Sequence, residues 1–81
     1  MKDIPSEIAA QFRGEIAKRR ISDAQLSEKA GISVPSIRRK VWLEKRDLSI
    51  AEAWAISLAL GIPFSEIVAS AERAAIGKDA A

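Results

Sequence analysis

Signals that begin and end α-helices recur so closely along this sequence that only short helices fit between them. Residues 22–25 (S-x-x-Q) and 49–52 (S-x-x-E) are capping boxes, in which a serine and the polar residue three positions later satisfy backbone N–H groups of a first helical turn. Gly31 and Gly61 then favour the left-handed conformation that ends a helix. Because no segment alternates apolar and polar residues over a strand's length, the sequence predicts an all-α fold.

Apolar residues between these signals repeat every three or four positions, which places them along one side of each helix. We expect five helices, over residues 5–20, 23–30, 34–43, 50–60 and 63–76, and a frayed tail at 78–81. The residues expected to face the core are Ile4, Ile8, Phe12, Ile16, Leu26, Ala30, Ile37, Val41, Ile50, Ala53, Ile56, Leu60, Phe64, Ile67, Val68, Ala71 and Ala75.

Residue types that carry much of enzyme and metal chemistry are missing. The 81 residues contain no cysteine, histidine or tyrosine, which excludes disulfides, thiolate and imidazole metal ligands, and the commonest general base. The carboxylates Asp23, Glu52 and Glu66 fall in expected first turns, where the helix dipole accounts for them. We therefore expect a single domain, residues 1–81, that is not an enzyme and has no catalytic residue, metal or cofactor.

The sequence contains no uninterrupted apolar run long enough to cross a membrane, and residues 1–15 show no apolar signal region. These features predict a cytoplasmic protein without a membrane partner.

Positive charge is concentrated in the middle of the chain. The formal net charge is +2, but residues 13–46 carry ten Lys and Arg against four acids, while the two ends are mildly acidic. Such a distribution indicates a face that meets a polyanion. A solvated helical surface is the alternative interpretation.

Residues 22–43 form the most informative unit, a helix-turn-helix pattern of two short helices joined by the turn 31–33. Leu26 and Ala30 on the first helix are spaced to meet Ile37 and Val41 on the second. The second helix would then project from the core and enter a DNA major groove about 12 Å wide.

These residues resemble a known family. The run Ala-Gln-Leu-Ser-Glu-Lys-Ala-Gly-Ile-Ser at 24–33, followed by Ile37-Arg38-Arg39, resembles the lambda-repressor-like (Cro/XRE) helix-turn-helix domain, and residues 49–63 are similar to that family's fourth helix and the turn after it. The resemblance covers roughly residues 8–70. It implies a five-helix domain, often dimeric on its operator, that reads DNA bases with its third helix. We therefore expect a sequence-specific double-stranded DNA-binding transcriptional regulator, a repressor resembling small phage or prophage immunity repressors.

Three departures from the family bear on docking. Asp23 stands where the family often has a glutamine that grips phosphate, and Lys40 stands where it usually buries an apolar residue, a role that Val41 takes over. The loop after the third helix lacks the usual glycine and is about one residue longer.

The far side of the third helix supplies the candidate base-reading residues. Arg39 lies nearest the centre of that side and has the donors to bond guanine O6 and N7 together. The candidate base-reading set is Val34, Pro35, Ser36 and Arg39, and capping, core packing or a solvated charge are their alternative roles. Candidate phosphate contacts are Ser22, Ser33, Arg38, Lys40, Lys45 and Arg46. We expect Arg13, Lys18, Arg19 and Arg20 to form a solvated face.

The fifth helix carries more apolar surface than one small core needs. A homodimer interface is expected at Phe64, Val68, Ala71 and Ala75, although packing against the first helix would also account for them. We expect Trp42 and Trp54 to pack in the core or a dimer rather than to stack on single-stranded nucleic acid. The alternative function is a helical protein-interaction module with a protein partner, such as an antitoxin or an antirepressor.

Overall fold

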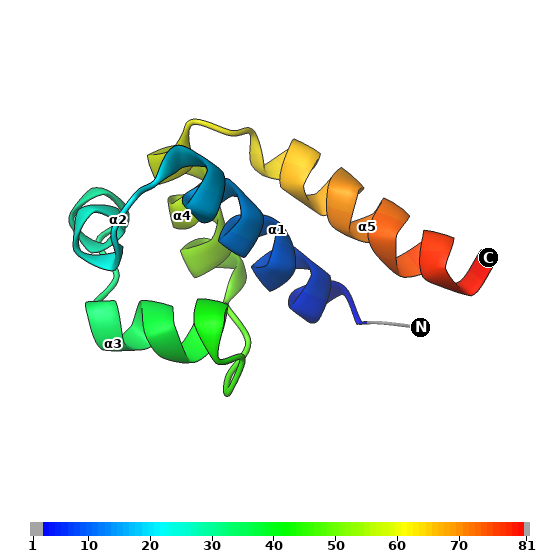
Figure 1. Ribbon diagram of the computed structural model, residues 1–81, viewed down its shortest axis with the longest axis horizontal. Helices are drawn as coiled ribbons and strands as arrows, with labels where there is room; N and C mark the ends of the chain where they lie inside the picture. Colours follow the sequence, from blue (N-terminus) through cyan, green and yellow to red (C-terminus); the bar gives the residue numbers. More distant parts are fainter. Residues whose placement is uncertain (1–2, 81) are drawn as a thin grey trace.

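Every regular element of residues 3–80, the part that the computed structural model describes, is helical, as predicted; for residues 78–80 it describes the backbone alone. The elements are α1 (Ile4–Arg19), α2 (Asp23–Ala30), α3 (Val34–Ile37), the π-helical segment η1 (Arg38–Trp42), α4 (Ile50–Leu60) and α5 (Phe64–Ala80) (Figure 1). Because η1 continues α3 without a break, we treat residues 34–42 as one third helix, which makes five helices in all.

The predicted helix starts are confirmed. The Gln25 N–H donates to Ser22 Oγ at 3.1 Å and the Glu52 N–H donates to Ser49 Oγ at 3.0 Å, and both capping boxes are complete. Asp3 caps α1, since its carboxylate accepts the Ser6 N–H at 2.8 Å. Local sequence alone therefore sets where these helices begin.

The ends of the helices use the left-handed conformation at four positions. Gly31 and Gly61 both have a φ of 73°, as their positions predict. Arg20 and Glu44 adopt φ values of 55° and 51°. A side chain makes that conformation unfavourable by about 1 kcal/mol or more. At Arg20 the cost is offset by local backbone hydrogen bonds, from the Arg20 N–H to the Ala17 carbonyl and from the Ile21 N–H to the Ile16 carbonyl, both at 3.2 Å, and at Glu44 by the ion pair with Arg13.

The core gathers side chains from all five helices. Phe12 of α1, Leu26 of α2, Ile37 and Val41 of the third helix and Ile56 of α4 are fully buried together. Helix α5 runs along α1 (Figure 1) and buries Ile67, Ala71 and Ala75.

The expectation that Ile50 faces the core is wrong, and so is a place in the core for the two tryptophans, whereas their alternative place in a dimer stays a prediction. Ile50 is 79% exposed and Trp54 is 56% exposed, because α4 turns Ala53, Ile56 and Leu60 inward and these two residues outward. Trp42 is 38% exposed at the end of the third helix, so neither tryptophan belongs to the core.

The fifth helix is longer than predicted. It continues through Gly77 to Ala80, so the expected stop at Gly77 is wrong: a glycine with a right-handed backbone weakens a helix by about 1 kcal/mol but does not end it. The tail 78–81 was predicted to fray, but the backbone of residues 78–80 belongs to α5. Residue 81 and the side chains of residues 78–80 lie outside the part of the chain that the structure describes.

Within the described part of the chain, no single helix is both long and apolar enough to cross a membrane, and α4 and α5, which reach that length together, are bent by 110° at their junction.

Candidate nucleic-acid interface

The third helix packs one side against the core and exposes its other side, which we call the free side, to solvent. Ile37 and Val41 are fully buried, whereas Pro35, Arg38 and Arg39 are exposed. In Figure 1 this helix runs along the edge of the molecule away from α5. The predicted separation into a buried and a free side is therefore present.

The second half of the third helix is widened into a π-helical turn. The Leu43 N–H donates to the Arg38 carbonyl at 2.8 Å, five residues back, and the Lys45 N–H donates to the Arg39 carbonyl at 2.9 Å. A π turn holds one residue more than an α turn. The second of these bonds folds the loop back so that Lys45 lies beside the Arg39 peptide.

Arg13 of α1 braces the end of the widened turn. Its Nη1 donates to the Val41 carbonyl at 2.8 Å and forms an ion pair with Glu44 at 3.2 Å. The expectation that Arg13 belongs to a solvated face is therefore wrong, because its guanidinium satisfies a helix-end carbonyl and holds the left-handed Glu44.

Lys40 is tied to α4 rather than presented on the free side. Its Nζ donates to Glu52 Oε2 at 2.7 Å, and about a fifth of each side chain is exposed. The hydrogen bond from Lys40, followed by the one from the Ser49 backbone N–H, lowers the pKa of Glu52. Lys40 was predicted to contact phosphate, but its ammonium group points toward α4 and is already paired with Glu52.

Asp23 joins the start of α2 to the third helix. Its carboxylate accepts the Trp42 indole N–H at 3.1 Å and lies 3.4 Å from Arg38 Nε. These two contacts offset part of the negative charge of Asp23, which would otherwise repel a phosphate bound near the start of α2. The same residues line a shallow hollow of about 450 Å³ formed by Ile21, Ser22, Asp23, Arg38, Trp42 and Leu43.

Four exposed cations remain around the free side. Arg38 keeps two thirds of its side chain exposed, and the side chains of Arg39, Lys45 and Arg46 are exposed with no hydrogen-bond or ion-pair partner among the residues that the structure describes. The charges of Arg39, Lys45 and Arg46 are neither paired nor buried, and the ion pair between Arg38 and Asp23 leaves most of the Arg38 side chain exposed, so all four cations are accessible to a polyanion.

The predicted serine contacts are occupied by capping. Ser33 Oγ accepts the Ser36 N–H at 3.3 Å and donates to Ser36 Oγ at 2.9 Å, while Ser22 completes its capping box. Ser36 is therefore half-buried beside its cap, next to half-buried Val34 and exposed Pro35. The structure brings all four candidate base-reading residues together on one helix, with Arg39 the most accessible long side chain.

The expected dimer interface on α5 is not available as predicted. Ala71 and Ala75 are fully buried within the chain, where α5 packs along α1, so a partner cannot contact them. Phe64 and Val68 are half-buried. The alternative of packing against α1 therefore accounts for this stripe.

Three positioning residues escaped sequence reasoning: Arg13, Asp23 as an acceptor from Trp42, and Glu52 as a partner of Lys40. Only Glu52 left a signal, because a capping-box carboxylate has a second oxygen free for a nearby cation.

No family model, curated protein or solved structure matches this chain.

Proposed function

We propose that this protein is a sequence-specific double-stranded DNA-binding regulator that places its third helix in the major groove. One observation carries the proposal: four exposed cations surround the free side of a helix seated by two buried residues, while three nearby carboxylates, those of Asp23, Glu44 and Glu52, are engaged by other side chains. Asp47, next to Arg46, is an exposed carboxylate in the same region, so cations outnumber free carboxylates there. The resemblance of residues 8–70 to the Cro/XRE family supports the same function.

Base reading is assigned to the accessible part of the third helix. The Arg39 guanidinium has the forked donors that bond guanine O6 and N7, the commonest specific contact. Pro35 and Val34 offer apolar surface for a thymine methyl, and Ser36 offers a hydroxyl.

Phosphate binding is assigned to Arg38, Lys45 and Arg46, which lie beside that surface and position the helix without specifying sequence. Contacts of this kind release counterions, so these three give a slope of log affinity against log salt of about −3.

A protein bound across a promoter excludes polymerase, so we propose repression, in the cytoplasm where the DNA of a phage or its host lies. The function is binding rather than catalysis.

Selection from a random duplex library at near-physiological salt tests this function. Enrichment of a defined sequence supports it, and an inverted repeat with half-site centres about ten base pairs apart would show two copies on one site. Weak binding without enrichment would contradict sequence reading, and the protein-interaction alternative would then take precedence.

A further inference from the structure

The outer face of α4 is apolar although it is exposed. Ile50, Trp54 and Leu58 are 79%, 56% and 60% exposed, and their spacing of four residues places them in one stripe. Ala51 beside them is exposed as well. A helix that is apolar on all sides is normally buried, and a contiguous apolar patch on a surface marks an interaction site.

This stripe carries no charge that would suit nucleic acid or a charged protein. Glu52 is the only charged residue of α4, and its carboxylate is bound to Lys40 and to the Ser49 N–H. Ser57, the only other polar residue of the helix, is buried and donates to the Ala53 carbonyl. The occupant of the stripe must therefore be apolar.

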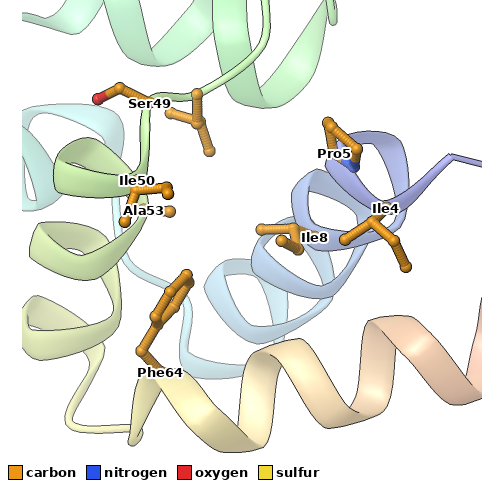
Figure 2. A pocket seen from close by; sticks show the side chains of 8 residues that line it. Ile4, Pro5, Ile8, Ser49, Ile50, Ala53 and Phe64 are labelled. Atoms are coloured by element: carbon orange, nitrogen blue, oxygen red, sulfur yellow. The ribbon is translucent and has the colours of Figure 1, made fainter.

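An apolar hollow lies next to the stripe. Figure 2 shows it between the starts of α1, α4 and α5, with Ile8 and Phe64 facing Ile50 and Ala53 across it. Its volume is about 220 Å³. Since an apolar cavity of about 150 Å³ holds a benzene molecule, this hollow is large enough for an aromatic side chain. Ile50 belongs to both the hollow and the stripe, so the two form one surface.

We propose that this surface, Ile50, Trp54, Leu58 and the adjoining hollow, binds a second copy of the chain. A twofold interface must be self-complementary, and this surface offers both a projecting aromatic side chain and a hollow to receive one. The pairing places Trp54 of each copy against the hollow of the other. It uses none of the cations around the third helix, so it does not depend on the proposed function.

The area sets the strength of the pairing. A large apolar side chain has a surface on the order of 200 Å² when fully exposed. The three side chains of the stripe are 79%, 56% and 60% exposed, so the stripe contributes about 400 Å² from each copy and about 800 Å² in the pair. Interfaces below about 1,200 Å² are weak and transient, and the hollow adds only its rim. The monomer already buries a complete core, so the pair should form and separate with protein concentration.

Sedimentation over concentrations from about 1 µM to about 1 mM, without DNA, tests the proposal. We expect a reversible monomer–dimer equilibrium in which Trp54→Glu raises the dissociation constant at least thirtyfold, as removal of a central aromatic residue does. Ile76→Glu is the matched control, because Ile76 is 59% exposed on α5 and outside the surface. That variant should stay within about threefold of the unchanged protein. Circular dichroism verifies that each variant is folded, and Leu58→Gln replaces Trp54→Glu if the latter unfolds.

A second readout follows the indole directly. In Trp42→Phe, Trp54 is the only fluorophore, and its emission should move to shorter wavelength as concentration rises. A protein that remains monomeric at about 1 mM would overturn the proposal, as would an equal loss of association in Ile76→Glu or an emission maximum that does not move. Binding of the monomer to uncharged lipid vesicles, or to an unrelated protein through Trp54, would likewise replace a second copy as the occupant.

Discussion

The α1–α5 pair and the third helix are held in place by different forces. Helix α5 lies along α1 through apolar side chains, with Ala71 and Ala75 fully buried. The third helix has only two buried side chains, and its end is held by polar contacts from three other helices: Arg13 of α1, Asp23 of α2 and Glu52 of α4. Apolar packing makes the body stable, whereas directional contacts set the angle and the widened end of the helix that faces solvent.

This difference separates stability from binding. A change in a buried residue should lower the stability of the whole domain. A change in a polar brace should loosen the third helix locally, and a change on its free side should alter binding alone.

The largest expected effect is that of Ile37→Ala. Removing this fully buried side chain should lower the free energy of unfolding by about 2–5 kcal/mol, because it leaves a cavity where the third helix meets the core. Urea denaturation followed by circular dichroism measures it. The same change at exposed Ile76 should stay within about 0.5 kcal/mol. Equal losses would mean that Ile37 does not anchor the helix.

Arg13→Ala should have an intermediate and local effect. It removes a charged donor from the Val41 carbonyl and should lower stability by about 1.5–3 kcal/mol. Amide hydrogen exchange at Leu43 and Lys45 should accelerate more than exchange in α5. Arg19→Ala is the control, because Arg19 forms only an exposed ion pair with Glu15 and should cost about 0.5 kcal/mol. Uniform acceleration along the chain would show that Arg13 has no special role at the third helix.

The Lys40–Glu52 contact predicts a pH dependence of at most about 1 kcal/mol, the upper end for an ion pair that solvent screens. The pKa of Glu52 is lower in the folded than in the unfolded state, so its contribution is present above the unfolded pKa, near 4.5, and is lost as the pH falls through the folded pKa. Glu52→Gln keeps the capping box but removes the charge. The difference in stability between the two proteins should therefore shrink in the acidic range. A constant difference from pH 7 to pH 3 would contradict the ion pair.

The smallest expected effect compares the two left-handed side-chain positions. Arg20→Gly should raise stability by about 0.5–1 kcal/mol, because glycine adopts this conformation without strain. Glu44→Gly should raise it less, since it also removes the ion pair with Arg13. Thermal unfolding measures both. A larger gain in stability for Glu44→Gly than for Arg20→Gly would show that the ion pair between Arg13 and Glu44 does not stabilise the fold.

Sequence reasoning succeeded where the determinants are local. The capping boxes and Gly31 depend on groups within a few residues, and the buried pair Ile37 and Val41 follows from helical spacing. The complete set of helices was therefore predictable, apart from the extension past Gly77.

It failed where distant residues decide. The end of the π turn is contacted by Arg13, which lies twenty-eight residues before the Val41 carbonyl that it binds. The exposure of Trp54 depends on which side of α4 meets α2, and the apolar composition of that helix hides the answer. Ala71 and Ala75 are buried because α5 packs against α1 of the same chain rather than against a second copy, and the spacing of apolar residues along α5 does not distinguish the two arrangements. In the candidate site, the exposed arginines were predictable from position, but the pairing of Lys40 with Glu52 was not.

The central claim, that the free side of the third helix reads DNA, is tested most directly by Arg39→Ala against Arg73→Ala. Both remove one exposed arginine, but Arg73 lies on α5, where its side chain donates, within the part of the chain that the structure describes, only to Ser70. With the duplex enriched by selection, Arg39→Ala should weaken binding by about 1–3 kcal/mol, roughly 5- to 150-fold, and relax preference at one base pair, without a change in thermal stability. Arg73→Ala should bind as the unchanged protein does. Equal losses in the two variants, or no loss in Arg39→Ala, would contradict the account.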